Sequence, residues 1–203
     1  MTKKQVNQVL GKAATAKLDL KDPAATEWLA KNLARIRTSM NQKTFLEEQN
    51  KKMRRVLMPG KMFFFGYSPM TKEELMFWDE FPIVLCLHMV DGGFLGLNFH
   101  YLPPVRRSAF INNLLKNVGN QNWSEYDQQM RPKNPDSRIR VGYPLLKNKS
   151  ELRLFKYCIK RYYLKQIVTN IAFIPPTEWK TVPFFPLDRF RGATKANVWS
   201  LAR

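Results

Sequence analysis

The stretch FPIVLCLHMVDGGFLGLNFHYLPP, residues 81–104, decides the fold of this 203-residue chain. A continuous apolar run, residues 82–90, is followed by an Asp-Gly-Gly turn and a second apolar run, residues 94–101. Two such runs joined by a glycine-rich turn are typical of a β-hairpin, because glycine adopts the positive φ that tight turns require. The two prolines after the second run cannot donate the hydrogen bonds of a continuing strand. We therefore predict an antiparallel hairpin at the centre of the fold.

Two shorter segments extend the predicted sheet. The segment MPGKMFFFGYSP is an aromatic run between Pro-Gly and Ser-Pro turn signals, and it predicts a strand near residues 56–67. Another short apolar run, near residues 169–174, ends at two prolines. Gly96, together with the glycines of the turn, permits sharp bending of the strands. The four strands predict a small curved antiparallel sheet or an SH3-like barrel.

Helical spacing of apolar residues predicts three helices, near residues 23–54, 104–118 and 150–168. The first begins at an Asp-Pro pair, in which Asp caps the helix and Pro occupies its first position. In the third, an apolar stripe lies beside a stripe of basic residues. We therefore predict an α+β fold in which these helices pack on the sheet.

Composition divides the chain into four parts. We expect a basic flexible arm over residues 1–21, an N-terminal helical segment over 22–55, a globular α+β domain over 56–191 and a basic C-terminal tail over 192–203. No apolar run approaches the ~20 residues of a membrane-spanning helix, and the N-terminus lacks the apolar region of a secretory signal. Cys86 and Cys158 are most simply reduced core residues, with a single disulfide as the alternative.

Charge is the strongest chemical signal in the sequence. The chain has 34 Lys and Arg against 16 Asp and Glu, a net charge of +18. Half of this excess falls within residues 131–165, where eleven basic residues face only Asp136 and Glu151. A solvated helix face usually mixes both signs, whereas a one-sided basic surface indicates a polyanionic partner. Phosphate contact therefore explains this segment better than simple solvation does.

The candidate phosphate contacts form three groups. The main group, within residues 138–165, lies in a predicted loop and in the predicted third helix. The second group, residues 106–107, follows the double proline. The third group, within residues 51–55, lies at the end of the first predicted helix. The candidates are Arg138, Arg140, Lys147, Lys149, Arg153, Lys156, Lys160, Arg161, Lys165, Arg106, Arg107, Lys51, Lys52, Arg54 and Arg55. Lysine and arginine bind DNA phosphates independently of sequence and release condensed counterions, so we predict affinity that falls steeply with salt.

Catalytic and cofactor motifs are weak in this sequence. The chain has no phosphate-binding loop, no dinucleotide glycine fingerprint and no CxxC or HExxH metal pattern, and we expect no cofactor, no metal and no enzymatic activity. His88, His100 and Asp91 could meet as metal ligands on the hairpin, although ordinary sheet-face hydrogen bonds are the simpler interpretation. Asp136 with Glu151 gives a faint acid pair of the nuclease type. A metal-dependent endonuclease is therefore the least favoured hypothesis.

Five strings of the sequence resemble those of a known family. MPGKMFFFGYSP, FWDEFPIVLCLHMVDGGFLGLNFHYLPP and LRLFKYCIKRYYLKQI, followed by IPPTEW and FFPLDRF, resemble virion-associated proteins of large contractile-tailed bacteriophages. Members of this family are often described as DNA end protectors. The resemblance covers residues 57–191. Met70 stands where the family has a basic residue, and Phe77 and Trp78 replace tyrosines, which affects packing rather than chemistry.

The resemblance implies a nonenzymatic protein that binds the termini of packaged double-stranded DNA. It would shield these termini from host exonuclease and help to complete the phage head. It implies a location in the virion, and in the host cytoplasm during assembly, with contacts to other head, neck or tail proteins. The alternative from another class is a structural connector of neck, tail or baseplate, whose basic surface binds an acidic protein partner.

Overall fold

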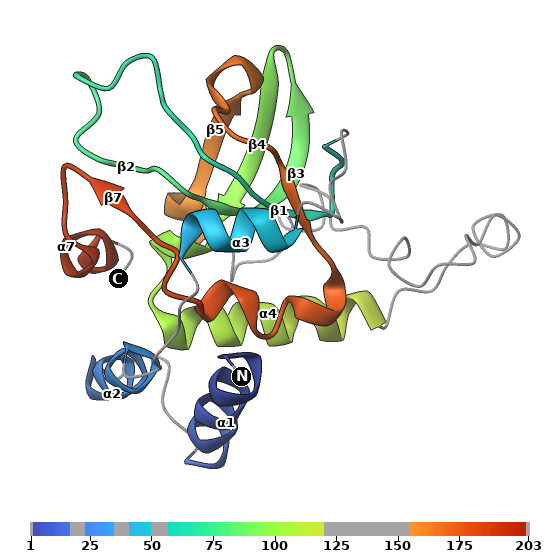
Figure 1. The fold of residues 1–203 in the computed structure, drawn as a ribbon. Coiled ribbons are helices and arrows are strands. Elements are labelled where there is room, and N and C mark those ends of the chain that lie inside the picture. The colour runs from blue at the N-terminus through green and yellow to red at the C-terminus, as the bar shows by residue number, and fades with distance from the viewer. Residues whose placement is uncertain (1, 17–22, 35–40, 50–56, 120–154, 202–203) are drawn as a thin grey trace, which may run out of the picture.

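A five-stranded antiparallel sheet forms the centre of the fold (Figure 1). The computed structural model describes residues 2–16, 23–34, 41–49, 57–119 and 155–201. The sheet has the order β5-β4-β3-β1-β6, and β2 and β7 form a separate pair. The strands are β1 (Met62–Phe64), β2 (Trp78–Asp79), β3 (Ile83–Val90), β4 (Gly93–Asn98), β5 (Ile159–Tyr163), β6 (Ala172–Ile174) and β7 (Phe190–Arg191).

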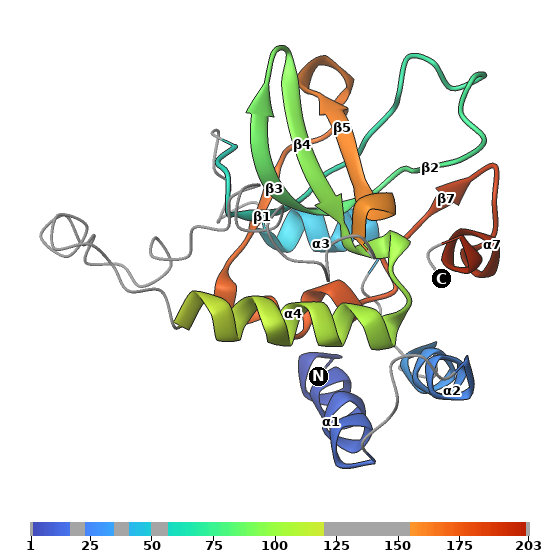
Figure 2. The ribbon, with the colours of Figure 1, turned by 180° about the vertical axis from the view of Figure 1, so that it is seen from behind.

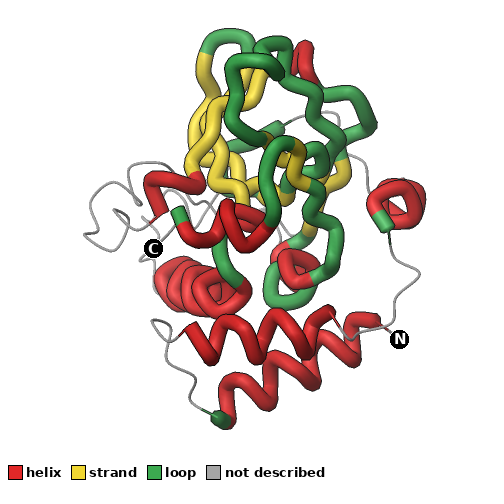
Figure 3. The backbone as a smooth tube through the Cα atoms, turned by 90° about the vertical axis from the view of Figure 1, so that its left-hand side faces the viewer, coloured by secondary structure: helices red, strands yellow, loops and turns green. Residues whose placement is uncertain are grey.

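The α-helices are α1 (Thr2–Thr15), α2 (Pro23–Ala34), α3 (Gln42–Gln49), α4 (Pro104–Gly119) and α7 (Lys195–Ser200). Helices α1, α2 and α4 lie below this sheet, and α3 lies apart from them against β6, as the views from behind and from the side show (Figures 2 and 3). Short 3₁₀ turns are η2 (Phe99–Tyr101), η5 (Leu164–Gln166), η6 (Pro176–Glu178) and η7 (Val182–Phe184). α1 packs on α2 and α2 packs on α4, which lies beneath the sheet.

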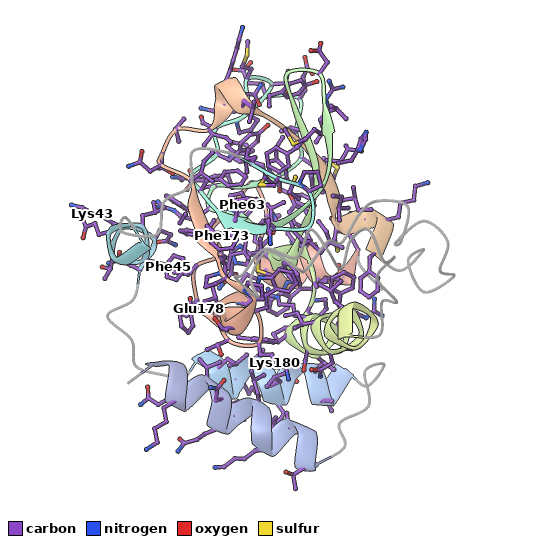
Figure 4. The ribbon with its side chains drawn as sticks, turned by 90° about the vertical axis from the view of Figure 1, so that its right-hand side faces the viewer. Lys43, Phe45, Phe63, Phe173, Glu178 and Lys180 are labelled. Carbon is purple, nitrogen blue, oxygen red and sulfur yellow. The ribbon has the colours of Figure 1, made fainter. Side chains whose placement is uncertain are left out.

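Successive side chains of a strand point to opposite faces of the sheet, and in β1, at the middle of the sheet, side chains on both faces are buried. In β1, Met62 and Phe64 face the main core, which the helices cover. Phe63 and the next residue, Phe65, face a second aromatic cluster. The ring centroids of Phe63 and Phe173 of β6 lie 6.0 Å apart in this cluster (Figure 4).

The central hairpin is bent by a β-bulge. The pairing of β3 with β4 shifts register between Cys86 and His88, which leaves one extra residue on β3. Such a bulge increases the local twist of a strand. At the turn, Gly92 has a φ of 67°, a conformation that residues with a side chain rarely adopt. The predicted hairpin and its curvature are therefore confirmed.

The α+β fold and all four predicted strands are confirmed, and the predicted helix at 104–118 corresponds to α4. Pro104 begins this helix, where its fixed φ suits the first turn. Val105, Phe110 and Leu114 are buried in the main core. No closed barrel is present among the described residues, because β5 and β6 are the two edges of an open sheet.

The predicted helix at residues 150–168 is wrong over its described part. Residues 155–158 form a 3₁₀ turn, and residues 159–163 form strand β5, which pairs with β4 from Leu97 to Gly93. Ile159 and Tyr162 fit a helical stripe equally well, but both residue types also favour strands. The free edge of β4 decides between the two structures by supplying hydrogen bonds to β5.

Two predictions for the N-terminal part also need correction. The described residues of the expected flexible arm form helix α1, because Val6 is buried in the main core with Leu29 and Leu33 of α2. The single helix predicted near 23–54 is instead two helices, α2 and α3, with residues 35–40 and 50–56 outside the described chain. The four-part division of the chain otherwise stays a prediction.

We predict that Gly93→Ala destabilises the protein by about 1–3 kcal/mol. A Cβ at Gly93 would lie 2.0 Å from the backbone oxygen of Tyr162, so β5 would have to move away from β4. Gly11→Ala in α1 is the matched control, because nothing beyond the adjacent residues and the helix's own backbone lies within 4 Å of its added Cβ. The control should be neutral or stabilising by up to ~1 kcal/mol. Urea unfolding measures both, and equal stability of the two variants would contradict β5 as a strand.

Candidate nucleic-acid interface

The edge strand β5 and the turns at its ends carry the described part of the predicted basic segment. Lys156 precedes the strand, Lys160 and Arg161 lie within it, and Lys165 follows in η5. Lys156, Arg161 and Lys165 are exposed. Arg161 projects from the edge strand itself, whereas Lys156 and Lys165 lie in the 3₁₀ turns on either side of it.

Arg161 is positioned by two contacts. Its Nη2 donates a hydrogen bond to the backbone oxygen of Asp91 in the β3–β4 turn, at 3.0 Å. Its guanidinium carbon lies 4.7 Å from the ring centroid of Tyr163, which is itself exposed. Both contacts leave an exposed guanidinium beside an exposed aromatic ring. This pair combines a phosphate-binding group with a surface on which a base can stack.

Lys160 differs from its exposed neighbours. Its Nζ lies 4.6 Å from the ring centroids of both Tyr101 and Tyr157, and it is only partly exposed. Burial lowers the pKa of this ammonium group, while Cys158 acts in the opposite direction. Two aromatic faces thus replace part of its hydration shell. Lys160 adds positive charge beneath the strand but is not a free surface lysine.

Arg107 was predicted as a phosphate contact, and this assignment is wrong. The residue is only 3% exposed, and its guanidinium donates to the backbone oxygens of Leu102 at 2.6 Å, Pro183 at 2.8 Å and His100 at 3.2 Å. The ring of Trp199 in α7 lies 5.6 Å from its carbon. Burial lowers its pKa, and nearby carboxylates oppose that effect. Arg107 therefore joins several chain segments and cannot reach a phosphate.

The remaining predicted contacts divide into two sets. Arg106 is partly buried in the first turn of α4. The others lie outside the described residues and stay predictions: Arg138, Arg140, Lys147, Lys149, Arg153, Lys51, Lys52, Arg54 and Arg55. The described candidates that are exposed are therefore Lys156, Arg161 and Lys165, while Lys160 and Arg106 are partly buried.

A buried polar network, which the sequence did not reveal, lies beneath this surface. Asp79 Oδ2 accepts hydrogen bonds from His100 Nδ1 at 2.7 Å and from Asn98 Nδ2 at 3.0 Å. Asn98 Nδ2 also lies 3.1 Å from the hydroxyl of Tyr162 in β5. The only sequence hint was a carboxylate directly before an apolar hairpin. The network connects the small β2–β7 sheet to the main sheet.

The structure separates the two histidines that were considered as metal ligands. His100 is fully buried and paired with Asp79, whereas His88 is exposed near the turn of the hairpin. In the part of the chain that the structure describes, no group of three or more potential ligands could hold a metal ion. Asp136 and Glu151 lie outside the described residues, so the nuclease-type acid pair stays a prediction.

Both cysteines are free and buried, as the sequence predicted. Burial raises the pKa of each thiol to about 12, although nearby Lys160, Arg107 and Arg106 lower that of Cys158. A thiol with such a pKa stays protonated at neutral pH, and only the thiolate is a strong nucleophile. Cys86 and Cys158 therefore act as core residues.

Among the described helices, none combines the length and apolar character needed to cross a membrane.

One family model matches residues 17–201, and its description is phage T4 terminal DNA protecting protein. The chain belongs to this family. The match covers most of the chain, including β5 and the buried network, and it confirms the resemblance found in the sequence. Searches of curated proteins and of solved structures find no match.

We predict opposite roles for the two arginines that sequence alone treats alike. Arg107→Ala should lower the free energy of unfolding by about 3 kcal/mol or more, because it leaves buried carbonyl oxygens without donors. Arg161→Ala should change it by less than about 1 kcal/mol, because the residue is exposed. Urea unfolding of both variants checks this. Similar losses in the two variants would contradict the division into buried and surface arginines.

Proposed function

We propose that the protein binds the phosphate backbone of double-stranded DNA without catalysis and protects the ends of packaged DNA. The observation that carries this proposal is the set of exposed cations along β5 and η5, in a chain of the terminal DNA protecting family. Lys156, Arg161 and Lys165 have no salt bridge to any described carboxylate. Their charges are therefore free to bind an external anion.

Protection of an end requires occupancy rather than turnover. A protein that neutralises several phosphates at a terminus prevents an exonuclease from reaching the last nucleotides. Phosphate contacts carry no sequence information, which suits a protein that must bind any terminus. No cofactor is needed for this mechanism. The protein would act in the virion, and in the host cytoplasm during assembly, and would help to complete the head.

A second candidate function is that of a structural connector between virion proteins. The loop from residue 70 to 76 exposes Met70, Leu75 and Met76, with exposed fractions of 82%, 41% and 83%. Glu73 and Glu74 are also exposed in this loop. Exposed apolar side chains gathered in one segment mark protein contact sites. This loop favours contact with a further phage protein, and it is compatible with DNA binding at β5.

An exonuclease protection assay tests the proposal. Linear double-stranded DNA is incubated with the protein and then with an exonuclease, and surviving full-length DNA is measured. We expect protection by the native protein and none by the triple variant Lys156→Glu, Arg161→Glu, Lys165→Glu. The triple variant should also reduce the salt dependence of DNA affinity. Each phosphate contact contributes about 0.9 to the magnitude of the slope of log affinity against log salt, so the loss of three contacts should lower that magnitude by about 3.

The matched control is the triple variant Lys4→Glu, Lys12→Glu, Lys180→Glu. These lysines are also exposed, but they lie on α1 and after η6, and the variant changes the net charge by the same amount. The control should still protect DNA. Equal loss in both triple variants would show that only net charge matters, and would overturn the proposed site. Cleavage of the DNA by the native protein with Mg²⁺ or Mn²⁺ would instead support the endonuclease hypothesis.

A further inference from the structure

The sheet face that carries the main core continues past the core towards the hairpin turn. Residues paired directly across an antiparallel sheet point to the same face. Leu85, Leu97 and Ile159 form one such row, which packs in or against the main core. The hairpin and the end of β5 then extend away from α4 (Figure 1). The next two rows on this face therefore lie beyond the helices.

These two rows form a surface that we call the tip platform. Its members are His88, Leu95 and Arg161 in one row, and Val90, Gly93 and Tyr163 in the other. His88, Arg161 and Tyr163 are exposed, with Tyr163 at 39%, and Val90 and Leu95 are partly exposed. The platform thus combines apolar side chains, one aromatic ring and one guanidinium.

Of the two middle positions of the tip platform, Leu95 holds one, and Gly93, which has no side chain, holds the other. A Cβ at Gly93 would lie 2.0 Å from the backbone oxygen of Tyr162, so a residue with a side chain would force β5 to shift. Gly93 is buried, and it places no side chain between Val90 and Tyr163. Arg161 is held over the Tyr163 ring by its hydrogen bond to the Asp91 oxygen. A low surface with a positioned ring and guanidinium fits a flat aromatic ligand.

The charges around the tip platform indicate which aromatic ligand it fits. Arg161 lies within the platform and Lys165 follows Tyr163 by two residues, so anionic groups are attracted to its β5 side. Exposed Asp91 lies at the turn, where it repels phosphates. A base face at the tip with phosphates along β5 satisfies both conditions. Nucleobases stack on aromatic rings and on arginine guanidinium planes.

We propose that the tip platform stacks on the terminal base pair of duplex DNA. This inference rests on the proposed function and explains how ends are distinguished. Within a duplex, each base pair is covered on both faces by its neighbours, so only a terminus exposes a face for stacking. Phosphate contacts exist along the whole duplex and cannot make this distinction. The cations of β5 supply affinity, and the tip platform supplies preference for ends.

The test compares two DNA probes with the full-length protein. One is a short blunt duplex, and the other is the same duplex with both ends closed by thymidine loops, which cover the terminal base pairs. We expect the native protein to bind the blunt duplex about tenfold more tightly, as one base–aromatic stack provides. Tyr163→Ala should bind both probes equally, at the affinity of the closed duplex. Tyr163→Phe should keep the preference, because it keeps the ring.

Lys165→Ala is the control, since it should weaken binding to both probes by the same factor and leave their ratio unchanged. Thermal unfolding of each variant confirms that it is folded. Equal binding of both probes by the native protein, with exonuclease protection retained, would overturn the tip platform and leave the proposed function standing. Tighter binding of single-stranded oligothymidine than of the blunt duplex would also overturn it. Absence of binding to every probe would overturn the proposed function as well.

Discussion

The pairing of β5 with β4 is the interaction on which the candidate interface depends. It converts a basic segment into a rigid sheet edge and brings Arg161 to the carbonyl oxygen of Asp91 in the β3–β4 turn. It also places Tyr162 against Phe94, with ring centroids 5.3 Å apart, and within reach of Asn98. Gly93 is a condition for this pairing, because any side chain there would meet the backbone of β5. Without β5, the exposed cations would have no common surface.

Cations in this protein serve three physical purposes. Arg107 joins η2, η7 and α7 through buried contacts, and this requires an arginine because one guanidinium reaches several carbonyls in different directions. Lys160 packs between two tyrosine rings. Arg161 belongs to the exposed group on the sheet edge. A net charge of +18 therefore indicates a polyanionic partner, but it does not identify the residues that contact it.

Local signals in the sequence were sufficient for the hairpin and for α4. The Asp-Gly-Gly turn between two apolar runs has few alternatives, and a proline at the first helical position marks the beginning of α4. Local signals were insufficient for β5, because the spacing of Ile159 and Tyr162 also suits a helix. The strand forms only by pairing with the free edge of β4, which lies about 65 residues earlier in the chain. Burial of Arg107 was equally hidden, since one of its acceptors, Pro183, is 76 residues away. Long-range pairing, rather than local propensity, decides both cases.

The most direct measurement of the central claim is hydrogen exchange of the full-length protein with and without a short blunt duplex. The account predicts that DNA slows backbone exchange in residues 156–166 and in the β3–β4 turn, because the phosphates and the terminal base pair cover these segments. Exchange in α1 and α2, which lie on the far side of α4, should not change (Figure 1). Slower exchange confined to α1 and α2, with β5 unaffected, would contradict the account.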